Sequence, residues 1–291
     1  MIISLAAELK TVRQRVIPMT IIDVDGMEHY FEQTGTGDPL VLIHGAFVDS
    51  RMWDPQFDYF GTRNRVIRYD LRGHGQTGPS DLPTYTIDGF ADDLERLILE
   101  LGLEQPIVCG MSLGGMIAQA YAVRASVNLR ALILADTAVS VSLTLSDKLQ
   151  RYVLFPKWAM KLTIRSLSAR NFTRFSFWLA RVTRSGEWFG RDEATAEYVR
   201  SCMLQLSDSE YEKIYDSIYD FGLQPLDRIR APTLVLNGEY ESKAVFRHTE
   251  ELQRRVPKVE AAIVPGAGHT SNMENPESFN RLVSEFLSRS A

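Results

Sequence analysis

Short apolar runs rich in β-branched residues recur along the first half of the chain. Between these runs lie stretches with apolar residues at helical spacing, of which TIDGFADDLERLILELGL is the clearest. Continuous apolar strands that alternate with amphipathic helices are typical of a parallel sheet covered on both faces. The pattern therefore predicts an α/β fold with a doubly wound, mostly parallel sheet. The four runs are PLVLIHG at 39–45, RVIRYDL at 65–71, PIVCG at 106–110 and ALILADT at 131–137.

The alternation stops between residues 138 and 225 and then resumes. The interrupting segment is rich in Trp, Phe, Tyr and Arg at helix-like spacing, which indicates an inserted helical lid. After it come the strand PTLVLNG, a helix through FRHTEELQRRV, the strand VEAAIVPG and a final helix through PESFNRLVSEFL. We therefore predict one α/β domain over residues 19–137 and 226–291, a lid over residues 138–225, and an N-terminal extension over residues 1–18.

Composition and charge exclude several classes of protein. The chain has 24% charged and 45% hydrophobic residues and a formal net charge of −5, which argues against disorder and against a basic nucleic-acid binder. Cys109 and Cys202 have neither CxxC nor Cys/His ligand spacing, so neither a disulfide framework nor a zinc site is expected. A reducing, cytoplasmic location fits this cysteine usage best.

The first residues, MIISLAAELKTVRQRV, place the apolar run before the positive charges, which is the reverse of a secretory signal. No apolar run approaches the length of a membrane span, so membrane insertion is not expected. We interpret this segment as an amphipathic helix that precedes the domain. A peripheral membrane contact or a homodimer contact is the less favoured interpretation.

Gly110-Met111-Ser112-Leu113-Gly114 fits the pattern G-x-S-x-G, which is weak evidence alone because three fixed positions recur easily by chance. Its context is stronger. The run PIVC before it predicts a buried strand, and GMIAQAYAV after it predicts a helix. This strand-turn-helix setting projects a serine hydroxyl at the carboxyl edge of the sheet, so we predict that Ser112 is a nucleophile. The simpler interpretation is that Ser112 only caps the helix.

A second loop supplies the groups that would stabilise an oxyanion. His44-Gly45-Ala46-Phe47 follows the strand PLVLI, where such a loop offers a backbone N–H group. We expect the N–H groups of Ala46 and Leu113 to form the oxyanion hole, with Phe47 as the alternative donor.

The general base should lie on the loop after the last strand, because catalytic groups gather at the carboxyl ends of parallel strands. His269 stands there, in Pro265-Gly266-Ala267-Gly268-His269. Its imidazole can take the Ser112 proton near neutral pH. We therefore predict that His269 is the base, against the simpler interpretation of a surface histidine.

The acid that orients the imidazole has three candidates. The strand LVLN ends in Gly238-Glu239-Tyr240-Glu241, and the strand ALILA ends in Asp136. Either Asp or Glu can accept a hydrogen bond from the far imidazole nitrogen and stabilise the imidazolium. The chain order Ser, acid, His fits all three. We prefer Glu241, keep Asp136 as the alternative, and place Glu239 third.

These pieces together resemble the α/β-hydrolase superfamily over residues 20–290. The resemblance rests on HGAF, DLRGHG, GMSLGG, PTLVLNGE and PGAGHTSNMENPESF, which occur in the family's order. In that family the acid usually follows the Gly of a G-x-x-D turn by three residues, which falls on Glu241. Most members have Asp there, so the glutamate is a departure that leaves Asp136 as the alternative.

Motifs of two branches occur side by side. LADTA, GMSLGG and PGAGHTSNMENP are similar to the 3-oxoadipate enol-lactonase and small esterase branch, whereas GEYESK is similar to a menaquinone-pathway synthase. The resemblance implies a serine hydrolase that cleaves a small-molecule ester or lactone through an acyl-enzyme and needs no metal or organic cofactor. The alternatives are a lyase or synthase that uses the same residues for proton abstraction, and a non-catalytic small-molecule receptor.

The first half of the lid is strongly basic. Ten Lys or Arg residues and one acidic residue, Glu187, lie between Lys148 and Arg191, interleaved with aromatic residues. The simplest interpretation is amphipathic helices whose apolar faces pack on the core and whose basic faces lie in water. Arginines that bind a substrate carboxylate, or a lid that rests on an anionic membrane, are the alternatives.

Overall fold

The computed structural model of the protein describes most of the chain. The predicted N-terminal extension over residues 1–18 lies outside the described residues, and so does Trp188 of the basic segment. The described residues are 20–24, 26–124, 128–144, 148–149, 152, 156–183 and 190–290.

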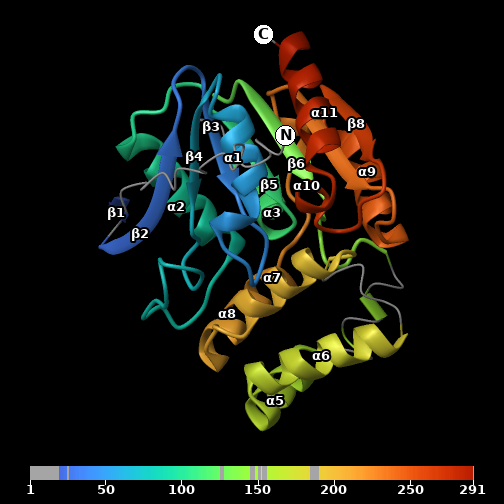
Figure 1. The fold of residues 1–291 in the computed structure, drawn as a ribbon. Helices are drawn as coiled ribbons and strands as arrows, with labels where there is room; N and C mark the ends of the chain where they lie inside the picture. Colours follow the sequence, from blue (N-terminus) through green and yellow to red (C-terminus); the bar gives the residue numbers. More distant parts are fainter. Residues whose placement is uncertain are drawn as a thin grey trace, which may run out of the picture.

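An eight-stranded sheet forms the centre of the molecule (Figure 1), with the strand order β1-β2-β4-β3-β5-β6-β7-β8. β2 pairs antiparallel with β1 and β4, and the pairs from β4 across to β8 are all parallel. The predicted mostly parallel sheet is therefore confirmed. The strands are β1 (Thr20–Val24), β2 (Met27–Thr34), β3 (Pro39–Ile43), β4 (Arg65–Tyr69), β5 (Ile107–Met111), β6 (Ala131–Ala135), β7 (Thr233–Gly238) and β8 (Val259–Val264).

The central strands are buried on both faces because apolar side chains occupy nearly every position. Every residue of β5 and β6 is buried, and the two strands pair with Ile107 opposite Ala131 and Met111 opposite Ala135. Since these strands are parallel and in register, the residues that follow them meet at one edge of the sheet. Ser112 and Asp136 are the first residues after β5 and β6.

Helices cover both faces of the sheet, so the doubly wound arrangement is also confirmed (Figure 1). One core cluster contains Leu94 of α2, Ile117 of α3 and Leu252 of α9. The cluster on the other face contains Phe57 of α1 and Phe286 of α11. The helices of this part are α1 (Asp54–Phe60), α2 (Ile87–Glu100), α3 (Leu113–Ala122), α9 (Lys243–Arg255), α10 (Ser271–Glu274) and α11 (Pro276–Arg289), with 3-10 helices at Ser50–Trp53 and Leu226–Arg228.

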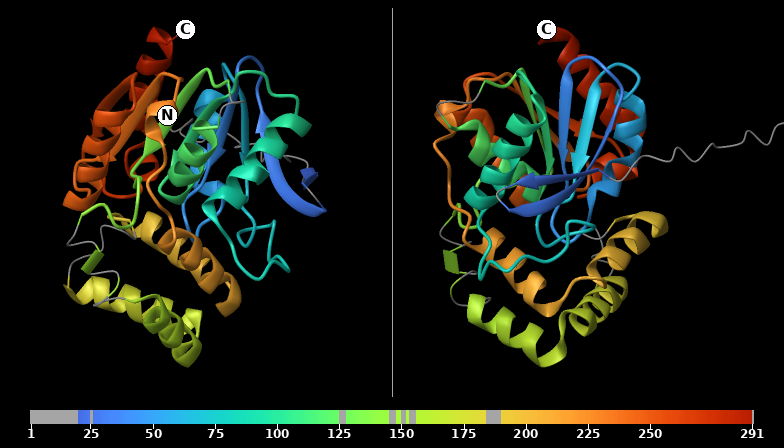
Figure 2. Two further views of the ribbon diagram at one scale, coloured as in Figure 1. Left: turned by 180° about the vertical axis from the view of Figure 1, so that it is seen from behind. Right: turned by 90° about the vertical axis from the view of Figure 1, so that its left-hand side faces the viewer.

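In the described part of the chain between β6 and β7, four further helices form the lid. They are α5 (Lys157–Leu167), α6 (Ala169–Thr183), α7 (Glu193–Met203) and α8 (Asp208–Tyr219). α7 and α8 lie next to the carboxyl edge of the sheet, and α5 and α6 form an outer layer beyond them (Figures 1 and 2). The predicted helical insertion is thus present and lies over the edge at which β5 and β6 end.

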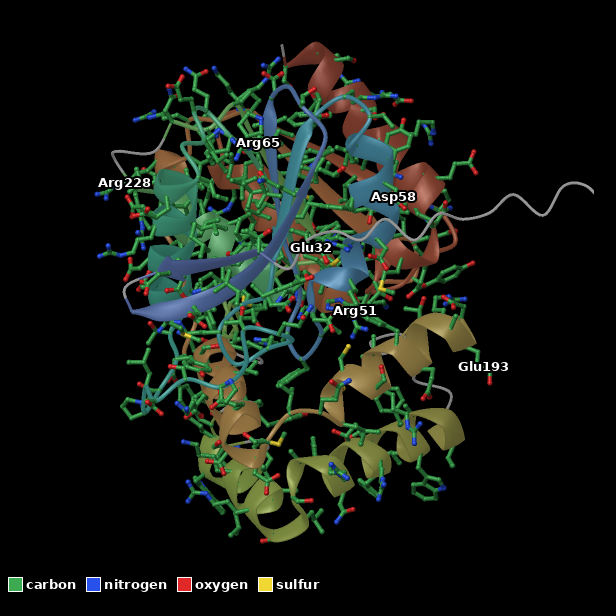
Figure 3. All side chains as sticks on the ribbon, turned by 60° about the vertical axis from the view of Figure 1, so that its left-hand side comes forward. Glu32, Arg51, Asp58, Arg65, Glu193 and Arg228 are labelled. Atoms are coloured by element: carbon green, nitrogen blue, oxygen red, sulfur yellow. The ribbon has the colours of Figure 1, made fainter. Side chains whose placement is uncertain are left out.

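A polar cluster around the buried Asp49 carboxylate joins the lid to the core. The Tyr198 hydroxyl of α7 donates a hydrogen bond to a carboxylate oxygen of Asp49 at 2.8 Å. The Arg51 guanidinium binds the same carboxylate at 2.6 Å and lies at the boundary between the core and the lid (Figure 3). Burial alone would raise the pKa of Asp49, but these two partners outweigh it and hold the pKa at about 2.

Candidate active site

Ser112 stands in a strained turn between β5 and α3. Its φ of 51° lies in a region that residues with a side chain rarely adopt, and its side chain makes no cap hydrogen bond to the helix. Two glycines permit this turn. A Cβ on Gly114 would lie 2.2 Å from the Ile43 carbonyl oxygen, and one on Gly110 would lie 2.2 Å from the Gly114 carbonyl oxygen. The hydroxyl of Ser112 is therefore free of a capping role and available for other partners.

His269 follows β8 and connects Ser112 to Glu241. Its Nε2 atom lies 3.0 Å from Ser112 Oγ, and its Nδ1 atom lies 2.5 Å from Glu241 Oε2. Burial alone would lower the pKa of His269, but the hydrogen bond and negative charge of Glu241 outweigh it, so the pKa is raised. The arrangement fixes the imidazole with one nitrogen toward a carboxylate and the other toward a hydroxyl.

The two other candidate acids make different contacts. Asp136 accepts hydrogen bonds from the Gly238 N–H at 2.8 Å and from the Ser271 hydroxyl. Burial raises the pKa of Asp136 to about 7. Glu239 accepts a hydrogen bond from the Gly266 N–H at 2.8 Å. Glu241 is therefore the candidate whose hydrogen bond to the imidazole is observed, while Asp136 joins the end of β7 to the helix that follows His269.

The two expected oxyanion donors differ from the alternative donor in their hydrogen bonds. Among the described residues, no acceptor is found for the N–H group of Ala46 or of Leu113. The Phe47 N–H instead donates to His74 Nε2 at 3.2 Å. Burial lowers the pKa of His74 to about 3, so this imidazole is neutral and can accept that bond. The N–H groups of Ala46 and Leu113 remain available for a ligand oxygen.

His44 supports the same loop from beneath. Its Nδ1–H donates to the Gly45 carbonyl at 2.7 Å, and its Nε2 accepts from the Leu71 N–H at 3.0 Å. Burial lowers the pKa of His44, which keeps it neutral. Both nitrogens are used within the scaffold, so His44 shapes the loop that carries Ala46.

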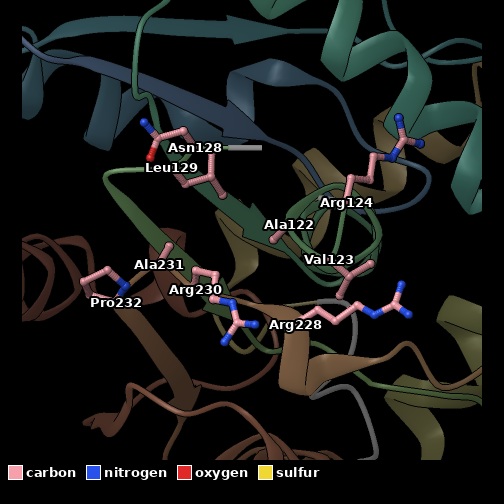
Figure 4. A pocket seen from close by; sticks show the side chains of 9 residues that line it. All are labelled: Ala122, Val123, Arg124, Asn128, Leu129, Arg228, Arg230, Ala231 and Pro232. Carbon is pink, nitrogen blue, oxygen red and sulfur yellow. The ribbon is translucent and has the colours of Figure 1, made fainter. Parts of the chain in front are cut away.

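Two cavities lie on different sides of the molecule. The larger, about 420 Å³, is lined by Arg124, Arg228 and Pro232 among others, at the edge where β6 and β7 begin (Figure 4). That edge is opposite to Ser112. The second cavity, about 270 Å³, lies between the loop Phe47–Asp49 and the lid residues Cys202 and Glu210. The second cavity, which lies beside the loop that carries Ala46 and Phe47, is therefore at the junction of the core and the lid.

Sequence reasoning missed Ser271 and the Asp49–Tyr198 pair, because no local motif marks these residues. Ser271 lies two residues after His269, and its hydroxyl contacts Asp136, which is distant in the chain. Asp49 and Tyr198 are likewise separated by more than a hundred residues. In the described part of the chain, no cluster of His, Cys, Asp or Glu is arranged to hold a metal ion, and no helix is long and apolar enough to cross a membrane.

Residues 40–282 match the family model described as the alpha/beta hydrolase family. The chain belongs to the alpha/beta hydrolase family. This hydrolase is 29% identical over 265 residues to the AB hydrolase superfamily protein YisY of Bacillus subtilis, covering 88% of this chain and 94% of that protein. It is 26% identical over 256 residues to 3-oxoadipate enol-lactonase 2 of Acinetobacter baylyi, covering 86% and 88% of the two chains.

A solved structure agrees with this membership. The hydrolase superimposes on a thermophilic esterase from Thermogutta terrifontis with a TM-score of 0.75 and 26% sequence identity, covering 94% of this chain and 97% of that one. The likeness extends over the sheet and the lid, because nearly the whole of both chains is covered.

Proposed function

We propose that this hydrolase cleaves a carboxylic ester or lactone through an acyl-enzyme on Ser112. The observation that carries the proposal is the hydrogen-bonded series from Ser112 Oγ to His269 Nε2 and from His269 Nδ1 to Glu241 Oε2, at 3.0 and 2.5 Å. A serine, a base and an orienting carboxylate in this order form the arrangement that activates a hydroxyl for attack on an acyl carbon. The similarity to an enol-lactonase and an esterase supports the same reaction class.

In the proposed reaction, His269 Nε2 takes the Ser112 proton while Ser112 Oγ bonds to the acyl carbon. The N–H groups of Ala46 and Leu113 hold the oxyanion that forms. The tetrahedral intermediate then expels the alcohol oxygen, which receives the proton from His269. A water molecule attacks the acyl-enzyme with His269 again as base, and the carboxylic acid leaves with Ser112 restored. Glu241 stabilises the imidazolium at each stage.

An uncharged acyl group fits the surroundings better than a carboxylated one. Lys161 and Arg165 of the lid are paired with Asp216 and Glu212, at 2.6 and 2.9 Å. Among the described residues, no Lys or Arg lines the cavity at the Phe47–Asp49 loop, whereas acidic side chains do. These acidic side chains, Asp49 and Glu210, already bind Arg51 and Lys213, so a second carboxylate in the substrate would find no unpaired cation in the lining of this cavity.

Hydrolysis of aryl esters and lactones by wild type, Ser112→Ala and Ser284→Ala tests the proposal. Ser284 lies on α11 and serves as the matched control, because its hydroxyl contacts only the exposed Tyr59 among the described residues. We expect wild type and Ser284→Ala to hydrolyse the esters and to be labelled by a fluorophosphonate, and Ser112→Ala to do neither. Hydrolysis that survives Ser112→Ala excludes the proposed nucleophile.

The two alternative functions give different outcomes in the same assay. A lyase or synthase that uses Ser112 and His269 for proton abstraction forms no acyl-enzyme when its substrate is trapped and analysed by mass spectrometry. A receptor on this scaffold binds small molecules with little or no turnover. We expect instead that quenched wild-type reactions carry the acyl group on Ser112.

A further inference from the structure

The outer layer of the lid exposes apolar side chains on the face that points away from the sheet. α6 packs its inner face, with Phe172 and Thr173, toward α7 and α8, and the Phe172 ring lies 6.0 Å from the Tyr211 ring of α8. On its other face, Phe175, Trp178 and Val182 lie one or two turns apart and are 51%, 58% and 61% exposed. α6 is therefore apolar on two faces, and its packing against other described residues uses mainly one of them.

α5 adds to this exposed surface. Trp158 and Leu162, one turn apart, are 68% and 58% exposed. We name the exposed set on α5 and α6 the outer apolar surface. It consists of Trp158, Leu162, Phe175, Trp178, Leu179 and Val182. The interpretation from the sequence, in which the apolar faces of the lid helices pack on the core and the basic faces lie in water, is wrong for these residues.

Positive charge accompanies these apolar side chains. Residues 157–183 contain Lys and Arg but neither Asp nor Glu, although the whole chain carries a net charge of −5. Three of the basic residues, all on α5, pair with acidic residues of α8: Lys157, Lys161 and Arg165. Arg170 and Arg174 of α6 are exposed, and no ion pair is found for either among the described residues. Their charge therefore faces solvent next to the outer apolar surface.

We propose that the outer apolar surface docks this protein onto an anionic lipid bilayer. Exposed Trp and Phe side chains beside Arg are the combination that enters the headgroup region, because the rings bury apolar area while the guanidinium groups meet lipid phosphates. The net negative charge of the whole chain opposes approach by its other faces and favours this orientation. Docking of this kind places α5 and α6 on the bilayer and α7 and α8 between the bilayer and Ser112.

A second copy of the chain fits the same surface less well. In a symmetric dimer built on α6, the identical patches face each other, so the cations Arg170 and Arg174 of one copy are brought close to those of the other. No acidic residue of α5 or α6 is present to neutralise them. An anionic bilayer supplies the missing negative charge and the apolar medium together.

Co-sedimentation with lipid vesicles tests the docking and does not depend on the proposed catalytic function. Wild type is compared on phosphatidylcholine vesicles and on vesicles with a quarter phosphatidylglycerol. The variants are Phe175→Ser/Trp178→Ser, Arg170→Gln/Arg174→Gln and the control Leu99→Ser. Leu99 is 70% exposed on α2 of the core and lies outside the outer apolar surface.

We expect wild type and Leu99→Ser to bind the anionic vesicles and to bind phosphatidylcholine weakly. The aromatic double variant should lose about tenfold in affinity or more, and the arginine double variant should lose the preference for anionic lipid. Light scattering and circular dichroism establish that each variant is folded and report its oligomeric state. The proposal is overturned if wild type fails to bind the anionic vesicles, if Leu99→Ser weakens binding as much as the aromatic variant, or if the aromatic variant converts a wild-type dimer into a monomer.

Discussion

The Asp136 carboxylate accepts a hydrogen bond from Ser271, two residues beyond His269, and another from the Gly238 N–H at the end of β7. A single buried side chain thus joins the turn that leads to Glu241 to the segment that carries His269. Asp136 itself has a φ of 44°, a conformation that is strained for a residue with a side chain. We therefore expect the two contacts of Asp136 to help hold the segments that carry Glu241 and His269 in their relative positions.

Asp136→Asn tests this linkage through the pH dependence of stability. Burial raises the pKa of Asp136 to about 7 in the folded protein, above the ordinary value of 3.8. The folded state therefore holds a proton there that the unfolded state releases, so the contribution of Asp136 to stability falls as the pH rises from about 4 to about 7. The amide of the variant does not titrate. We expect the melting temperature of wild type, relative to Asp136→Asn, to decrease between pH 4 and pH 8.

Asp227→Asn is the control for that measurement, because Asp227 is exposed on the 3-10 helix Leu226–Arg228. Its substitution should leave the wild-type pH dependence of the melting temperature in place. Identical curves for wild type and Asp136→Asn would mean that Asp136 does not titrate in this range.

Glu241→Gln should lower the rate and move the acid limb of activity. The charge and hydrogen bond of Glu241 raise the pKa of His269 against the effect of burial. Loss of the charge lowers that pKa, so the imidazole stays neutral to lower pH and the limb of kcat/KM shifts toward acid. We expect kcat to fall by about 10³-fold or more, because the amide stabilises the imidazolium poorly and permits the wrong tautomer.

Glu241→Asp separates charge from geometry. It keeps the carboxylate but shortens the side chain, so we expect a smaller loss of kcat than in Glu241→Gln and an acid limb closer to that of wild type. The measurement is kcat/KM against pH for the three proteins on one aryl ester. An acid limb that is the same in wild type and Glu241→Gln would argue that another carboxylate, with Asp136 first, controls the imidazole.

Sequence patterns were sufficient to predict the parallel part of the sheet and the placement of the residues that follow its strands. The runs that became β3 to β8 are mainly apolar, with exceptions such as Arg68 of β4 and Glu260 of β8. Because parallel strands bring the residues after them to one edge, Ser112, Ala46 and His269 could be placed together from spacing alone. The choice between Glu241 and Asp136 could not be made from the sequence, because the two residues follow neighbouring strands. Their different hydrogen bonds depend on how the loops after those strands fold.

The surface of the lid was the poorest prediction. Helical spacing indicates that α6 is amphipathic, but it does not say which side faces the core when apolar residues occupy more than one face. Phe172 and Trp178 are both aromatic residues of one helix, yet one is partly buried against α8 and the other is 58% exposed. Only tertiary packing distinguishes them.

Gly114→Ala should prevent the turn at Ser112 from forming. The added Cβ would lie 2.2 Å from the Ile43 carbonyl oxygen and 2.8 Å from that of His44, and both atoms belong to the backbone of the central sheet or the loop after it. We expect destabilisation by about 3 kcal/mol or more, or no folded protein. Gly222→Ala is the matched control, since nothing lies within 4 Å of its added Cβ. Urea unfolding of the three proteins measures the difference, and equal stability of Gly114→Ala and wild type would contradict the close approach.

Tyr198→Phe tests how firmly the lid is held to the core. The substitution keeps the ring and removes the hydroxyl that donates to Asp49 at 2.8 Å, so a buried carboxylate loses one of the partners that hold its pKa at about 2. We expect a loss of about 1–3 kcal/mol in the free energy of unfolding and faster proteolysis within the lid. Tyr59→Phe, on the exposed side of α1, should change neither the free energy of unfolding nor the rate of proteolysis.

Because Arg51 remains bound to Asp49 in Tyr198→Phe, the lid should loosen without detaching. We therefore expect kcat on a small ester to change less than the rate of proteolysis. Unchanged proteolysis and stability in Tyr198→Phe would show that apolar packing alone holds the lid in place.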